Sequence, residues 1–141
     1  MSPSEAAVVL AILARVDQRK VGDADAKGWS SSLTDIRVED AAAVADAWYR
    51  TNSERPMPAD IRAGVRAIRT QRLELAGEPP TAWELGIDPD RTSDYRAALY
   101  RWRRQVGDGD DPKVATAELK PRPVVQAIAN VFPSPPRKAS A

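Results

Sequence analysis

The chain has 141 residues, the length of one domain or of one small domain with an appendage. Its 21 Lys and Arg residues nearly balance its 20 Asp and Glu residues, so the net charge of +1 indicates no global affinity for nucleic acid or membranes. Cysteine and histidine are absent, which excludes disulfides, Cys/His zinc sites, thiol nucleophiles and an imidazole base. No cofactor is expected.

The N-terminus predicts neither a secretory signal nor a membrane anchor. Residues 1–5 lack the basic start of a signal peptide, and no apolar run approaches the roughly 20 residues that span a bilayer. We therefore expect a cytoplasmic protein with no membrane partner, in a reducing compartment that is consistent with the missing cysteines.

Helical spacing dominates the first half of the chain. Ser2 and Glu5 have the spacing of a capping box, and an apolar helix face follows them. A second helical segment carries Trp29 and Leu33, which lie four residues apart on one face. We expect Trp29 and Trp48 to be central to the core, because each large aromatic side chain buries on the order of 150–250 Å².

Two further helices complete the predicted first domain. An Ala-rich segment at residues 38–50 forms the third, and Pro58 is well placed to open a fourth that stops at Gly77. No stretch alternates as a strand does. Residues 1–77 therefore predict a four-helix bundle in an all-α protein.

Residues 78–106 predict a second, basic helical unit. Residues 81–85 give about one helical turn, residues 86–89 form a turn, and a long helix starts at Asp90 or Thr92. One face of that helix is apolar, formed by Tyr95, Leu99, Trp102 and Val106.

Residues 107–141 predict a flexible, Pro-rich tail. It opens with an acidic spacer at residues 107–112, and five of the twelve prolines follow this spacer. A short apolar segment at 124–132 interrupts it, formed by Val124, Val125, Ile128, Val131 and Phe132. This segment is either a strap over the folded body or a partner-binding segment that folds on contact.

No enzymatic motif is present in the sequence. There is no P-loop and no glycine-rich phosphate cradle. Asp108, Asp110 and Asp111 are spaced like part of a calcium loop, but the Glu ligand that completes such a loop is missing. The three residues are interpreted as part of a solvated linker, so no metal site is predicted. Because no enzymatic motif is present, neither a small-molecule substrate nor an enzymatic activity is predicted.

Charge is distributed unevenly along the neutral chain. Residues 17–46 have a net charge of −3, whereas residues 50–72 and 91–106 each have a net charge of +4. One predicted stripe contains Arg62, Arg66 and Arg69, and a second contains Arg96, Tyr100 and Arg103, with Arg101 and Arg104 on the back of the same helix. Such stripes bind phosphates or an acidic protein surface, or they are solvated faces that pair with the acidic half of the chain.

Residues 80–104 loosely resemble a helix-turn-helix. The residues that carry this resemblance are Ala82, Leu85, Gly86, Ile87 and Tyr95. Arg91, Thr92, Ser93 and Arg96 would then face bases or phosphates. This alternative predicts a DNA-binding regulator. Its candidate nucleic-acid contacts are Arg62, Arg66, Arg69, Arg91 and Arg96.

The order of features in residues 4–68 resembles another family. These features are Glu5 before Val8 and Ile12, Trp29 with Leu33, an Ala-rich stretch at 40–47 ending in Trp48-Tyr49, and Pro58 three residues before Ile61. In this order they resemble the phage-encoded replicative-helicase loader/inhibitor family. The resemblance implies a small N-terminal domain and a C-terminal region that contacts a hexameric replicative helicase, and it transfers no catalytic residue.

The leading hypothesis is a non-enzymatic phage DNA-replication accessory protein, in the bacterial host cytoplasm, that binds and loads or inhibits a replicative helicase. The predicted partner contacts are an Arg/Tyr cluster and the apolar tail segment, because Arg and aromatic residues dominate binding hot spots. They are Arg96, Tyr100, Arg103, Arg104, Val125, Ile128 and Phe132. A DNA-binding regulator and an inhibitor of another host protein are the alternatives.

Overall fold

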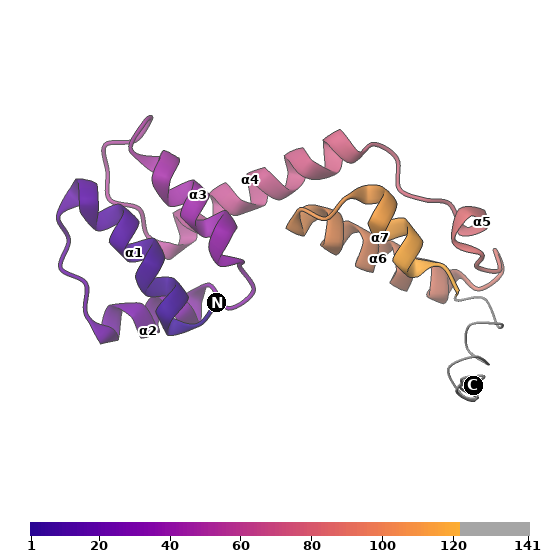
Figure 1. The fold of residues 1–141 in the computed structure, drawn as a ribbon, viewed down its shortest axis with the longest axis horizontal. Coiled ribbons are helices and arrows are strands. Elements are labelled where there is room, and N and C mark those ends of the chain that lie inside the picture. The colour runs from indigo at the N-terminus through magenta and orange to yellow at the C-terminus, as the bar shows by residue number, and fades with distance from the viewer. Residues whose placement is uncertain (122–141) are drawn as a thin grey trace, which may run out of the picture.

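The computed structural model of the protein describes residues 1–121, which contain seven α-helices and no β-strand, so the all-α prediction is confirmed. The apolar segment predicted at 124–132 lies outside the described residues. In chain order the helices are α1 (Pro3–Asp17), α2 (Asp23–Ser32), α3 (Val38–Trp48), α4 (Pro58–Ala76), α5 (Ala82–Leu85), α6 (Thr92–Asp108) and α7 (Pro112–Leu119) (Figure 1).

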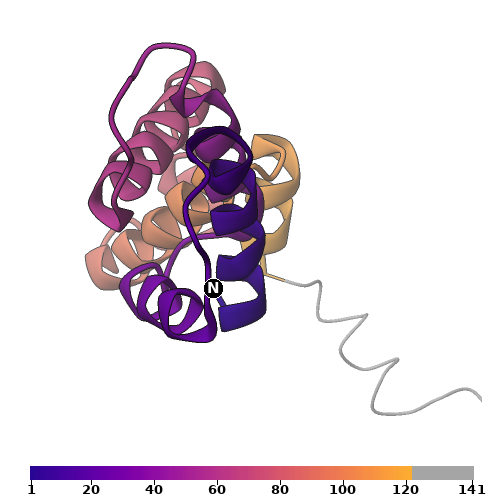
Figure 2. The same ribbon diagram turned by 90° about the vertical axis from the view of Figure 1, so that its left-hand side faces the viewer.

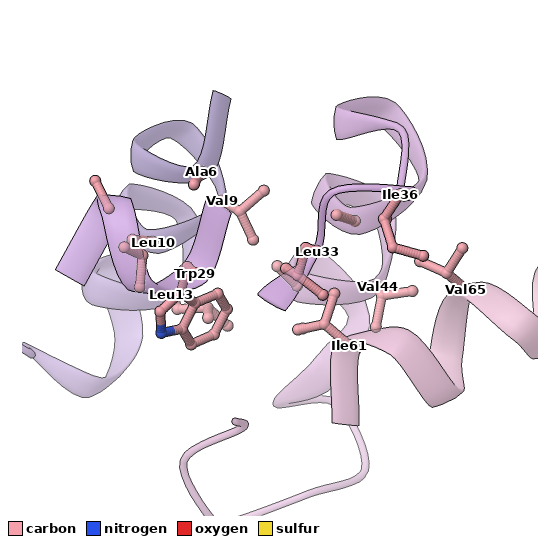
Figure 3. Close-up of a cluster of buried hydrophobic side chains, with 13 residues drawn as sticks. Ala6, Val9, Leu10, Leu13, Trp29, Leu33, Ile36, Val44, Ile61 and Val65 are labelled. Atoms are coloured by element: carbon pink, nitrogen blue, oxygen red, sulfur yellow. The ribbon is translucent and has the colours of Figure 1, made fainter. Parts of the chain in front are cut away.

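The N-terminal core is formed where α1, α2, α3 and the first half of α4 meet (Figure 3). Its large side chains come from apolar positions three or four residues apart, and removing them from water is the main term that stabilises this half. The largest of them are Val9, Leu10, Leu13, Trp29, Leu33, Ile36, Val44, Ile61 and Val65.

The start of α1 follows the sequence prediction. The Glu5 backbone N–H donates to Ser2 Oγ (3.3 Å), and the Ser2 N–H donates to Glu5 Oε2 (2.6 Å), so the capping box is confirmed. Hydrogen bonds from Ser2 lower the pKa of the Glu5 carboxyl group.

Trp48 does not occupy the central position expected of it. Trp29 is buried in the core, but Trp48 is the last residue of α3 and is only half-buried. Its indole Nε1–H donates to the Glu54 carbonyl oxygen (2.7 Å) outside the helix, since this polar edge needs an acceptor. α3 approaches α4 so closely that a Cβ on Gly64 would lie 2.5 Å from Val44 Cγ1.

Helix α4 belongs to both halves of the molecule, so the predicted domain boundary at Gly77 does not separate two packing units. Its first half contributes to the N-terminal core, while Leu73 and Ala76 pack against Trp102 and its neighbours in a second, smaller core. Figure 1 shows α4 extending from the N-terminal bundle over α6, and Figure 2 shows the bundle in front with α7 behind it.

The prediction of a flexible region from residue 107 onward is wrong for residues 107–121. Helix α6 continues to Asp108, and Gly109 ends it with a left-handed φ of 106°. Asp111 then caps α7, because its carboxylate accepts the Lys113 backbone N–H (2.7 Å), and Pro112 occupies the first helical position. α7 packs on α6 and buries Ala115, so the second helical unit extends to the end of the described chain.

Within residues 1–121 there is no helix that combines the length and the apolar character needed to cross a membrane.

Candidate docking surface on helix α6

Helix α6 is held by its apolar side. Trp102 and Val106 are buried between α4 and α7, as their spacing predicts. Three polar contacts fix the orientation of this side: the Trp102 indole N–H donates to Thr116 Oγ1 (3.1 Å) and is 3.4 Å from the Pro112 carbonyl oxygen, and the Tyr95 hydroxyl donates to the Pro80 carbonyl oxygen (3.1 Å). The opposite side of α6 is therefore presented in a fixed orientation.

The exposed side of α6 carries Arg96, Tyr100, Arg103 and Arg104, which we call the α6 face. Tyr100 is 69 % exposed, although a tyrosine ring usually gains from burial. Within residues 1–121, Arg96 and Arg103 form neither an ion pair nor a side-chain hydrogen bond. Arg104 is exposed and lies 4.0 Å from the half-buried Asp108, a long contact that contributes little to stability. The face thus keeps its positive charge.

The arginines of α4 have a different environment. Arg62 donates to both carboxylate oxygens of Asp35 (2.8 Å each), and Arg69 lies 2.9 Å from Asp108. The hydrogen bond from Arg62 lowers the pKa of Asp35, which keeps that carboxyl group charged. Two predicted nucleic-acid contacts, Arg62 and Arg69, are therefore neutralised within the chain, and only Arg66 of that stripe is exposed without a described partner.

A cluster of ion pairs joins the N-terminal bundle to the end of α6. Arg72 donates to Asp40 (2.6 Å and 3.1 Å) and to the Gly107 carbonyl oxygen (2.9 Å). Asp40 is 4 % exposed, so its charge requires this partner. Arg37, beside α3, donates to the Asp108 carbonyl oxygen. Of these residues, Arg37 and Asp108 also line a cleft beside the α6 face.

The cleft has a volume of about 720 Å³ and separates α6 from the start of α1 and the α2–α3 connection. Tyr100, Arg103 and Arg104 line its α6 wall together, so the structure brings three of the predicted partner contacts to one place. Arg104 was expected on the back of the helix, but it shares this wall. Glu5, Glu39 and Arg37 are on the opposite wall together with the Met1 amino group, and Arg37 lies 3.5 Å from Glu39, so this wall carries charges of both signs.

The helix-turn-helix interpretation of residues 80–104 is not supported by the geometry. α5 has only four residues, Ala82–Leu85, and packs chiefly against α7. A recognition helix needs a full first helix across its back to hold it in the major groove. Arg91 is at the N-cap of α6, exposed and 3.8 Å from Asp94.

The sequence interpretation missed Trp83, which is 84 % exposed on α5. Two signals were available: it lies two residues before Leu85, the buried anchor of a one-turn helix, and acidic residues surround it in the chain. The predicted contacts Val125, Ile128 and Phe132 lie outside the described residues.

The described part of the chain contains no group of three or more acidic residues arranged to hold a metal ion. Comparison of the chain with protein-family models, with curated proteins and with solved structures found no match. The resemblance of residues 4–68 to helicase loaders therefore stays a prediction.

Proposed function

We propose that the chain is a non-enzymatic docking protein that binds a replicative helicase of its phage or host through the α6 face, and so loads or inhibits that helicase. The observation that carries the docking role is the contrast between helices: Arg62, Arg69 and Arg72 are paired inside the molecule, whereas Arg96 and Arg103 keep their charge beside an exposed Tyr100.

The chemistry of the α6 face favours a protein partner with an acidic surface. Arg and Tyr together are enriched in binding hot spots, and a tyrosine next to a cleft offers apolar area at low entropic cost. The helicase as partner is supported by the resemblance of residues 4–68 alone.

Co-elution with the purified replicative helicase tests the proposal, using the full chain and its Tyr100→Ala and Arg103→Ala variants. We expect the unchanged chain to co-elute and Tyr100→Ala to weaken binding about 30-fold, the value for a hot-spot loss of about 2 kcal/mol.

Arg101→Ala is the matched control, because Arg101 is an exposed arginine of the same helix on another side. It should bind the helicase as the unchanged chain does. No co-elution of the unchanged chain, or equal losses for Arg101→Ala and Arg103→Ala, would contradict the proposal.

A parallel gel shift with duplex DNA tests the DNA-binding alternative. Binding of duplex DNA with an affinity that falls steeply with salt, by a log–log slope of about −0.9 for each phosphate neutralised, would favour it over helicase docking.

A further inference from the structure

Helix α5 is a preformed turn that displays a tryptophan. The Thr81 hydroxyl accepts the Glu84 N–H (3.3 Å), and Glu84 Oε2 accepts the Thr81 N–H (2.7 Å). Leu85 is fully buried beneath the turn, and Gly86 ends it with a φ of 67°. The backbone is fixed on both sides of Trp83, whose ring is nevertheless 84 % exposed.

The same turn is strongly acidic. Residues 78–90 contain four carboxylates and no basic side chain, a net charge of −4, and all four side chains are exposed: Glu78, Glu84, Asp88 and Asp90. We call residues 78–90 the acidic turn. An exposed indole ring in a stretch of chain that carries four carboxylates suits an occupant that is both apolar and cationic.

The C-terminal part of the chain has this composition. Residues 122–141 contain Arg122, Arg137 and Lys138 and no acidic residue, a net charge of +3, and they include the apolar segment 124–132. The charges of the two stretches are therefore opposite, and each carries apolar side chains.

The last described residues lie beside the acidic turn. A Cβ placed on Gly86 would be 3.5 Å from Pro121 Cδ. Hydrogen bonds with Thr81 lower the pKa of Glu84, and the nearby charge of Lys120 adds a smaller lowering. The eleven residues from Arg122 to Phe132 can span at most about 36–40 Å. The apolar segment is thus tethered within reach of Trp83.

We propose that residues 124–132 dock on the acidic turn over Trp83 of the same chain. The tether favours this occupant over a second copy, because a short linker raises the effective concentration of a segment to about the millimolar range. The docked segment covers the indole with Val and Ile side chains, and the cationic residues on either side of it pair with the carboxylates of the acidic turn. This inference does not rest on helicase binding.

Indole N–H signals in the NMR spectrum of the full chain test the docking. The protein has four tryptophans, and Trp83→Phe identifies the Trp83 signal by its loss. Ile128→Asp places a charge in the middle of the apolar segment. We expect it to shift the Trp83 signal while those of Trp29, Trp48 and Trp102 stay in place, which also shows that the body remains folded.

Ser134→Asp is the matched control, since it adds the same charge two residues beyond the segment. It should leave the Trp83 signal unchanged. The proposal is overturned if Ile128→Asp leaves that signal in place, or if both variants move it equally, because charge alone would then explain the effect. A Trp83 signal that moves on dilution of the unchanged chain would assign the site to a second copy and would also overturn it.

Discussion

Helices α4 and α6 carry similar rows of arginine, yet their environments differ. On α4, Arg62, Arg69 and Arg72 reach carboxylates of the N-terminal bundle and of the end of α6. On α6, Arg96 and Arg103 have no such partner within the described chain, and Tyr100 between them is exposed. An arginine row on a helix is therefore open to a partner only where the fold brings no carboxylate to it.

The difference follows from position along the fold. α4 crosses from the acidic N-terminal region to the second core, so acidic residues such as Asp35 and Asp40 lie beside it. α6 presents its apolar side to α4 and α7, which leaves its arginine-bearing side toward solvent and the cleft.

Removing a paired arginine of α4 should have the largest effect. We expect Arg72→Ala to lower the free energy of unfolding by about 3 kcal/mol, because it leaves the buried Asp40 carboxylate without its partner. Urea denaturation measures this value. Arg66→Ala is the control on the same helix, exposed and unpaired in the described residues, and should change it by less than about 0.5 kcal/mol. Equal effects of Arg72→Ala and Arg66→Ala on the free energy of unfolding would contradict the distinction between paired and unpaired arginines.

Removing the aromatic ring of the α6 face should affect binding and not folding. For Tyr100→Ala we expect an unchanged urea midpoint together with a partner affinity about 30-fold weaker, since the ring is 69 % exposed in the free protein. Titration calorimetry with the helicase measures the affinity. A lowered urea midpoint with an unchanged partner affinity would show that Tyr100 stabilises the fold, as Arg72 does, and does not bind the partner.

The pair between Arg19 and Asp17 tests, through its pH dependence, how much a paired arginine stabilises the fold. Arg19 and Tyr49 donate to Asp17 (2.5–2.8 Å), and this holds the pKa of the Asp17 carboxyl group well below its usual value. A carboxyl group whose pKa is lower in the folded state than in the unfolded state stabilises the fold at pH values above the unfolded-state pKa. This stabilisation is lost as the pH falls toward the folded-state pKa. We expect the free energy of unfolding to drop by about 1 kcal/mol between pH 5 and pH 3 on this account.

The measurement is urea denaturation at each pH, with Asp17→Asn beside Asp110→Asn. The first substitution should flatten the acid dependence. The second should leave it intact, since Asp110 is exposed and its side chain makes no described contact. An unchanged slope in Asp17→Asn would show that other carboxylates determine the acid sensitivity.

The smallest effect should come from Arg91, whose exposed pair with Asp94 spans 3.8 Å. Arg91→Ala should change the free energy of unfolding by less than about 0.5 kcal/mol and leave partner binding unaffected, because Arg91 lies outside the α6 face. A large loss of duplex DNA binding in this variant would instead support the DNA-binding alternative.

Local signals in the sequence were sufficient to predict where several of the helices begin and end. The capping box at Ser2, the start at Pro58 and the stop at Gly77 are all present, because each depends on neighbouring residues. The start of α7 had a local signal as well, an Asp-Pro pair followed by Ala115 and Leu119 at helical spacing. It was interpreted as a spacer because the acidic, Gly-rich residues before it dominate the composition.

The candidate site was only partly predictable. Tyr100 and Arg103 follow from helical spacing, since the spacing predicts that both lie in one stripe beside the apolar face of Trp102 and Val106. Pairing of Arg62 and Arg69 depends on carboxylates 27 and 39 residues away in the chain, a distance that no local pattern encodes. The exposure of Trp83 depends likewise on α5 being a single turn anchored by one leucine.

Hydrogen–deuterium exchange of the full chain, with and without the replicative helicase, tests the central claim most directly. Docking through the α6 face predicts slower exchange in residues 96–104 on complex formation, with residues 58–76 of α4 unchanged. Protection confined to α4 and the N-terminal bundle, with α6 exchanging as in the free protein, would contradict it.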